Sequence, residues 1–285
     1  MKKLIAALSA AVLTAAGLLT FPACSEPQAV YTVGDDGQYY ILTEVSGYNS
    51  YDIPPVYDDG EHGELPVTTI GERAFMNDGI NRVTIPDSIT RIENYAFAYS
   101  KLISIEIPQS VTYIGYAAFA YCSAIESVTI PSSVTALGPY AFAYCSSLEE
   151  VNVEAQIDTL YIGTFKGIVA NDFSGIYTNT SLTKISLPST LKYLHRDAIS
   201  DNFLTDIYFG GTAEEWQAVE VFYAEEQEVE DDEDSEDGET EIVVVYLTES
   251  EKIEYFSSDN LTIHCLDADI TYSGGAIHIV ERADG

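Results

Sequence analysis

The stretch from residue 85 to residue 151, IPDSITRIENYAFAYSKLISIEIPQSVTYIGYAAFAYCSAIESVTIPSSVTALGPYAFAYCSSLEEV, repeats one pattern three times. An Ile-Pro pair and an Ala-Phe pair each recur every 22 or 23 residues, and an aliphatic residue stands four positions before each Ala. The common pattern is L-x-x-I-x-I-P-x-S-V-T-x-I-G-x-x-A-F-x-x-C. Weaker copies extend it from Ile53-Pro54 to Phe209. A fixed period of this length is typical of proteins whose repeats stack into an array.

Each segment of the pattern predicts a local structure. The I-x-I part alternates like a strand, and the proline after it suits a strand that must end and turn. V-T-x-I-G predicts a second short extended stretch, and the A-F part predicts a helical or 3₁₀ turn. One unit cannot bury its own apolar side, so the units must stack. We therefore predict a leucine-rich-repeat solenoid of the α/β class with parallel strand ladders.

These blocks resemble the BspA-like leucine-rich repeats of bacterial surface proteins. LPVTTIGERAF (65–75) is similar to the usual entry into such arrays, and LTDIYFGGTAEEWQAV (204–219) and NLTIHC (260–265) resemble segments that close them. The resemblance spans roughly residues 30–265 and departs from the family pattern at Val153-Glu154, where the proline is absent. It implies a cell-surface protein with a role in adhesion.

Both ends of the array need caps, because open ends expose unpaired strand edges. Residues 30–33 and 39–42 flank a Gly-Asp-Asp-Gly turn and predict a β-hairpin N-cap. Thr212-Ala213-Glu214-Glu215 has capping-box spacing and predicts a helix whose Trp216 packs on the last repeat. A second hairpin is expected at 269–272 and 277–280. The C-terminal cap is therefore mixed.

The expected organisation has four parts. Residues 1–23 are a signal peptide, 24–66 a lipid-attachment segment with the N-terminal cap, 67–211 the solenoid, and 212–285 the C-terminal cap with an acidic loop at 225–241. This loop has 12 acidic residues in 17 and no basic one, so it should be solvated and mobile. Its Gly238 misses the position that an EF-hand requires, so we predict no metal site there.

The N-terminus has the features of an export signal. Lys2 and Lys3 precede an apolar run from Leu4 to Leu19, which has the proportions of a signal-peptide core. Phe21-Pro22-Ala23-Cys24 resembles a bacterial lipobox, with Cys24 as the lipid-attachment residue. The alternative is secretion without a lipid. Either way the sequence predicts an extracytoplasmic protein of a bacterial envelope or surface.

The charge limits the partners. The 285 residues include 12 Lys and Arg against 46 Asp and Glu, for a formal net charge of -34. Nucleic-acid binding is excluded, because it needs clustered basic residues. Anionic lipid surfaces would repel the chain as well, so we expect membrane contact only through the lipid anchor.

Residues for catalysis do not form a familiar constellation. The four histidines pair with no Cys or Glu at helical spacing, and the common nucleophile, zinc and phosphate motifs are absent from the sequence. We predict a non-enzymatic protein without cofactors. The enzyme alternative is a glycan-active accessory protein that uses Glu106 and Glu150 as its carboxylates, about 10 Å apart if they lie two repeats from each other.

Three surfaces are candidates for ligand binding. The outward positions of the strands form a flat polar stripe, which consists of Thr84, Glu106, Thr129, Asn152, Ser186 and Tyr208. A second stripe is aromatic and consists of Tyr99, Tyr121 and Tyr144; it either binds a partner or stiffens the array as a half-buried ladder. The third is an insertion between Val153 and Leu187 that carries Phe173 and Tyr177, unless it is only a tolerated loop.

Cys122 and Cys145 occupy the same slot of adjacent repeats, so they should stack about 5 Å apart. They form either a disulfide or two small buried thiols, and Ser100 in the preceding slot favours the thiols. Together, these features predict an adhesin-like surface protein that binds a protein or glycan. A purely structural spacer of a surface complex is the other non-enzymatic alternative.

Overall fold

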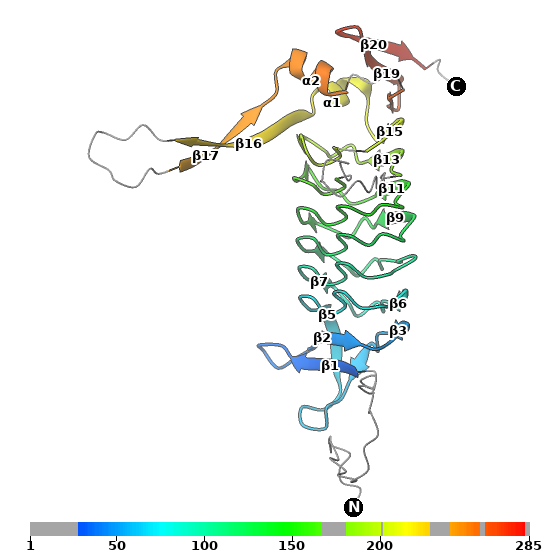
Figure 1. Cartoon of the computed structure of the whole chain (residues 1–285), viewed down its shortest axis with the longest axis vertical. Coiled ribbons are helices and arrows are strands. Elements are labelled where there is room, and N and C mark those ends of the chain that lie inside the picture. Colours follow the sequence, from blue (N-terminus) through cyan, green and yellow to red (C-terminus); the bar gives the residue numbers. More distant parts are fainter. Residues whose placement is uncertain (1–27, 167–180, 201, 229–239, 257–259, 283–285) are drawn as a thin grey trace, which may run out of the picture.

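The computed structural model describes residues 28–166, 181–200, 202–228, 240–256 and 260–282, which wind into an elongated stack of short turns (Figure 1). The predicted signal peptide and Cys24 lie outside the described residues.

One edge of the turns carries the strands of the I-x-I pattern. From Ser127 onward these strands belong to a seven-stranded sheet in the order β20-β19-β18-β15-β13-β11-β9. Its parallel part consists of β9 (Ser127–Ile130), β11 (Glu150–Val153), β13 (Lys184–Leu187), β15 (Asp206–Phe209) and β18 (Thr262–His264). Equivalent residues of successive repeats are paired, as Val128 is with Val151. The predicted parallel strand ladders are confirmed.

The V-T-x-I-G segments form a second set of short strands. β5 (Leu65–Ile70), β7 (Arg91–Ile92), β8 (Tyr113–Ile114) and β10 (Ala136–Leu137) are parallel neighbours in another seven-stranded sheet. β12 (Thr159–Leu160), β14 (Tyr193–His195) and β16 (Glu220–Glu228) continue the series in a four-stranded sheet with β17 (Thr240–Tyr246). The aliphatic residue of each of these strands is buried in the core, from Ile70 to Val221.

The phenylalanine of each Ala-Phe pair occupies the centre of the core. Phe75, Phe97, Phe119, Phe142 and Phe165 are each no more than 1% exposed. Their rings stack with centroids 4.7, 5.0, 4.8 and 5.8 Å apart, nearly parallel in the first three steps. Each stacked pair contributes about 0.5–1.5 kcal/mol beyond the burial of apolar area. One aromatic column therefore connects five successive turns.

The prediction of a helical or 3₁₀ turn at the A-F segment is wrong. In the four turns between Arg73 and Tyr144 this segment is a non-helical turn with two left-handed residues four positions apart, for example Tyr95 (φ 57°) and Tyr99 (φ 61°). This geometry turns alternate N–H groups toward the next repeat, so Phe97 N–H donates to Ala118 O at 2.7 Å. A helix would keep these bonds within the segment. Within the ranges that the structure describes, α-helices occur only in the C-terminal region.

The N-terminal end begins with an antiparallel hairpin of β1 (Gln28–Val33) and β2 (Tyr40–Ser46). β2 runs parallel to β5, so the hairpin covers the first turn of the array. Two short strands, β3 (Ser50–Asp52) and β4 (Val56–Tyr57), pair with β6 (Arg82–Thr84) and β5.

The C-terminal end contains the two described helices, α1 (Ala213–Gln217) and α2 (Glu249–Phe256), and a hairpin of β19 (Ala268–Ser273) and β20 (Ala276–Glu281). Thr212 and Glu215 form the capping box expected from the sequence. Trp216 is 2% exposed, packs edge-on against Phe209, and donates Nε1–H to Tyr272 Oη at 3.2 Å. The expectation that Trp216 packs on the last repeat is confirmed.

The ends of the predicted acidic loop belong to strands. β16 extends to Glu228 and β17 begins at Thr240, so residues 225–228 and 240–241 are paired, while 229–239 lie outside the described residues. The apolar run from Ile242 to Tyr246 favours a strand. Because β16 pairs with this strand, residues 225–228 are part of the β16–β17 ribbon and not of a loop. The ladders also continue beyond Gly211, through β16 and β18.

Candidate functional site

Four of the six predicted outward-facing residues lie side by side, and a fifth residue extends them. The strand registers pair Thr129 with Asn152, Asn152 with Ser186, Ser186 with Tyr208, and Tyr208 with His264. The residue before each of these five is buried, so their side chains point outward from the sheet. We call these five residues the strand face.

Thr84 and Glu106 do not belong to the strand face. Thr84 is exposed on β6, which pairs with β3 in a separate two-stranded sheet. Glu106 is exposed in a segment without an assigned strand, where Ile103 N–H bonds back to Asn81 O at 3.1 Å. Glu150, the other carboxylate of the enzyme alternative, is exposed at the beginning of β11. The stripe predicted from the sequence is therefore interrupted at the Glu106 repeat.

An aromatic pair stands at the C-terminal end of the strand face. Tyr208 is 44% exposed and stacks on the ring of His264, with centroids 4.7 Å apart and planes inclined by 21°. His264 Nε2 lies 2.9 Å from Asp206 Oδ1, and its Nδ1 lies 3.0 Å from Asp269 Oδ1. Arg282 Nη2 donates to the same Asp269 oxygen at 2.6 Å. The imidazole is therefore held in one orientation by two strands and the terminal hairpin.

This arrangement perturbs the neighbouring carboxyl groups. The hydrogen bond from His264 lowers the pKa of Asp206, and a bond from Thr205 lowers it further against the opposing effect of burial. Sequence reasoning missed the cluster because His264 lies 58 residues from Asp206. Aligning Ile263-His264-Cys265 with Ile207-Tyr208-Phe209 would have placed His264 at an outward position.

A groove of about 480 Å³ opens beside this pair. Its lining includes the polar side chains of Asn152, Gln156, Ser186 and Ser189 together with the rings of Tyr208 and His264. Amide and hydroxyl groups around an exposed aromatic surface can both accept and donate hydrogen bonds to a ligand. This combination suits a sugar ring or a polar protein segment.

The predicted aromatic stripe is a continuous stack on a different part of the turns. The ring centroids of Tyr99 and Tyr121 are 4.5 Å apart, and those of Tyr121 and Tyr144 are 4.6 Å apart. Tyr99 is 47% and Tyr121 38% exposed. All three residues have φ near +61°, a conformation that usually favours glycine. We call these three residues the tyrosine ladder; its geometry is compatible with both interpretations, a binding surface and a stiffening stack.

The cysteine pair consists of buried free thiols. Cys122 Sγ lies 3.2 Å from Phe97 O and 3.3 Å from Ser100 Oγ. Burial raises the pKa of the Cys122 thiol to about 12. The interpretation as small core residues is therefore confirmed over the disulfide.

Other candidates cannot be placed. Phe173 and Tyr177 of the insertion lie outside the described residues, as does Cys24. Over the described ranges, no three His, Cys, Asp or Glu side chains gather to hold a metal ion. Within the same ranges, no helix has the length and apolar character needed to cross a membrane.

The comparisons with known proteins identify the repeats. The family described as BspA type leucine rich repeat region matches residues 68–173 and 169–226 in six copies. No curated protein has a matching sequence. Because the family covers more than half of the chain, the repeats predicted from the sequence pattern are confirmed.

Solved structures of bacterial leucine-rich repeat proteins are similar at low identity. A protein from Bacteroides ovatus is 24% identical over 65% of this chain, with a TM-score of 0.47, and this chain spans only 54% of that protein. The T. pallidum leucine-rich repeat protein is 22% identical over 64% of this chain and 83% of its own, with a TM-score of 0.42. A leucine-rich cell surface protein from Faecalibacterium prausnitzii is 17% identical over 68% of this chain and 97% of its own, with a TM-score of 0.22. On the strength of the six matched repeats, the chain belongs to the BspA-type leucine-rich-repeat family.

Proposed function

We propose that the chain is a non-enzymatic binding protein of the bacterial cell surface, which holds an extracellular protein or glycan on its strand face. The observation that carries this proposal is the exposed Tyr208–His264 stack beside the groove. Asp206 and Asp269 fix the orientation of the His264 ring on which Tyr208 stacks, so the His264 ring loses little conformational freedom when a ligand covers the pair.

The proposed site lies at the end of the array, where the solenoid meets its C-terminal cap. His264 comes from the cap and Tyr208 from the last repeats, so the site exists only when both are folded together. The flat row of Ser186, Asn152 and Thr129 then provides further polar contacts along the array. A groove continued by a flat row suits an extended ligand.

Export and anchoring complete the proposal. The apolar segment before Cys24 and its lipobox-like sequence support a lipid-anchored surface location. Cys24→Ser should then release the protein into the medium and abolish labelling with palmitate. Labelled, membrane-bound protein in that variant would contradict an anchor at Cys24.

The binding experiment uses the mature chain on an array of glycans and extracellular proteins. Any hit is then measured with Tyr208→Ala, which removes the exposed ring, and with Thr84→Ala, which lies off the strand face. We expect Tyr208→Ala to weaken binding about tenfold or more, because central aromatic residues dominate interface energies, and Thr84→Ala to bind normally. Equal binding by both variants would move the site to the tyrosine ladder or to Phe173 and Tyr177.

A further inference from the structure

The β16–β17 ribbon projects sideways from the array at its C-terminal end (Figure 1). β16 pairs with β14 only over Glu220–Phe222, whereas its pairing with β17 runs from Phe222 to Glu228. Over the described residues, β17 has no second neighbour and forms the edge of its sheet. A two-stranded ribbon is only marginally stable in water, so this open edge can gain a third strand.

The backbone hydrogen bonds show which groups face the open edge. Leu247 N–H donates to Val221 O at 2.8 Å, which directs the Leu247 amide toward β16. Because amides alternate along a strand, those of Val245 also face β16, and those of Val244 and Tyr246 face outward. The bonds on the other side of β16 are consistent with this assignment. Phe222 is paired with Tyr246, and its carbonyl oxygen faces β14, where it accepts from Arg196 N–H at 2.7 Å.

The side chains at this edge are unusual for an exposed strand. Val244 is 50% and Tyr246 52% exposed, and the strand contains the run Ile-Val-Val-Val-Tyr at residues 242–246. Natural sheets commonly protect exposed edges with lysine, proline or a bulge. Among residues 240–246 there is no Lys or Pro. The edge therefore favours pairing with another strand.

The charge determines which strand can pair. Glu225, Glu226 and Glu228 lie on β16, and the whole chain carries a net charge of -34. A second copy would bring the same charges and be repelled. A strand with lysine or arginine side chains would be attracted, and the attraction would decrease with salt.

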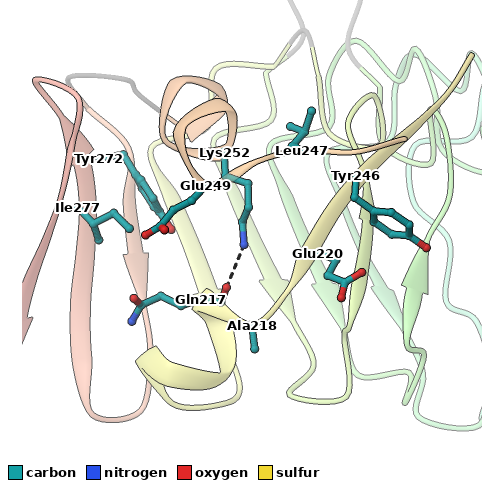
Figure 2. Close-up of a pocket in the computed structure, with 9 residues that line it drawn as sticks. All are labelled: Gln217, Ala218, Glu220, Tyr246, Leu247, Glu249, Lys252, Tyr272 and Ile277. Carbon is teal, nitrogen blue, oxygen red and sulfur yellow. Dashed lines mark hydrogen bonds between the residues drawn. The ribbon is translucent and has the colours of Figure 1, made fainter. Parts of the chain in front are cut away.

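A pocket at the base of the ribbon has the same preference (Figure 2). Its volume is about 390 Å³, and it is lined by Tyr246 and by the exposed residues Glu220 and Glu249. The pocket is also lined by Lys252. The Lys252 ammonium group is hydrogen-bonded within the protein, because Nζ donates to Gln217 O at 2.9 Å and to Val219 O at 2.6 Å. Lys252 also interacts electrostatically with both Glu220 and Glu249, so the pocket contains two carboxylates against one ammonium group and keeps a net negative charge.

We propose that the open edge of β17 binds an extended basic polypeptide by strand addition, with one of its Lys or Arg side chains in the pocket between Glu220 and Glu249. This surface shares no residue with the strand face, and the proposal is independent of the ligand bound there.

The test uses a labelled peptide of five Lys-Val repeats and the mature chain, with binding followed by fluorescence anisotropy at low and high salt. Val244→Pro removes an N–H that makes no bond to β16, so the ribbon should persist while strand addition is blocked. We expect at least tenfold weaker binding by this variant. Val245→Pro is the matched control: it removes an N–H that faces β16, and should disorder the ribbon itself. A peptide with N-methyl groups along one edge keeps its charge and should also bind at least tenfold more weakly.

Two results would overturn strand addition. The first is equal binding of the peptide to wild type and Val244→Pro, which would mean diffuse attraction of charges. The second is self-association that Val244→Pro abolishes in sedimentation, which would make a second copy the occupant. Glu220→Gln combined with Glu249→Gln tests the pocket separately: we expect at least threefold weaker binding, and unchanged binding would exclude the pocket from the site.

Discussion

The middle of the array and its C-terminal end are stabilised in different ways. From Phe75 to Phe165 each turn contacts its neighbours through equivalent residues, so ladders of one residue type carry the core. At the C-terminal end, Trp216 bonds to Tyr272, and His264 to Asp206, across 56 and 58 residues. Repetition produces a regular core in the middle, whereas unrelated segments meet at the end and form a site with varied side chains.

The largest effect is expected from the aromatic column. Phe119→Ala should reduce the free energy of unfolding by about 3–5 kcal/mol, because it leaves a cavity between two stacked rings. Trp216→Ala should reduce the free energy of unfolding by a similar amount, but the destabilisation should be confined mainly to the C-terminal end. Denaturant titration combined with hydrogen exchange separates the two outcomes. Loss of protection in the turns around Phe119 after Trp216→Ala would show that the two regions unfold as one.

The space around two glycines also differs between the middle of the array and its C-terminal end. A Cβ at Gly138 would lie 2.6 Å from the carbonyl carbon of Gly115, whereas a Cβ at Gly210 would approach Ser189 N only to 3.3 Å. Gly138→Ala must push two turns apart and should cost about 1–3 kcal/mol. Gly210→Ala, at the C-terminal end, should cost less than half as much. Equal losses, measured by chemical denaturation, would contradict the tighter spacing of the middle turns.

Acid should weaken the contact between Asp206 and His264 at the C-terminal end. The lowered pKa of Asp206 means that its bond to His264 stabilises the fold fully above the unfolded value near 3.9, and that this stabilisation disappears as pH falls through the folded value. Asp206→Asn should therefore cost about 1–2 kcal/mol at pH 7 and much less at pH 3. Denaturant titrations at both pH values measure this difference. A penalty that does not change with pH would mean that the charge of Asp206 is not involved.

The smallest effect is expected at the tyrosine ladder. Tyr121→Gly removes two stacking contacts worth about 0.5–1.5 kcal/mol each, but it relieves the left-handed conformation of Tyr121, which costs about 1 kcal/mol. The free energy of unfolding should therefore decrease by about 0–2 kcal/mol. If Tyr121→Gly also binds a ligand found in the glycan and protein screen as tightly as the wild type does, the tyrosine ladder is a stiffening stack. Weaker binding with unchanged stability would make it a contact surface.

The regular part of the fold could be predicted because its contacts repeat with the sequence. The spacing of Ile-Pro and Ala-Phe pairs fixes which residues meet, so the strand ladders and the buried Phe column follow from it. The left-handed turns could not be predicted in this way, because tyrosine is not a residue that marks positive φ. The periodic pattern showed where the turn was, but the A-F segment resembles a helix.

The candidate site was predicted only in part. Asn152, Ser186 and Tyr208 follow from strand alternation and lie together as expected. Asp206 and Asp269 became part of the site through the fold of the terminal hairpin, which joins segments with no common period. Sequence spacing has no information about such contacts. For this reason the binding features of a repeat protein are hardest to predict where its repetition ends.

The left-handed turns give their own side of the array an electrical direction, which the neighbouring strand side opposes. From each turn to the next, three N–H groups donate forward along the chain, as those of Tyr95, Phe97 and Tyr99 do to the turn of Ala118. Aligned peptide groups add their dipoles, so this side of the array has its positive pole toward the C-terminal end, opposite to an α-helix. On the neighbouring side, amides such as those of Thr90, Glu93 and Gly115 donate backward to Thr68, Ile70 and Ile92. Two opposed rows of peptide dipoles therefore run side by side along the array and offset each other, whereas in a single α-helix all of them add.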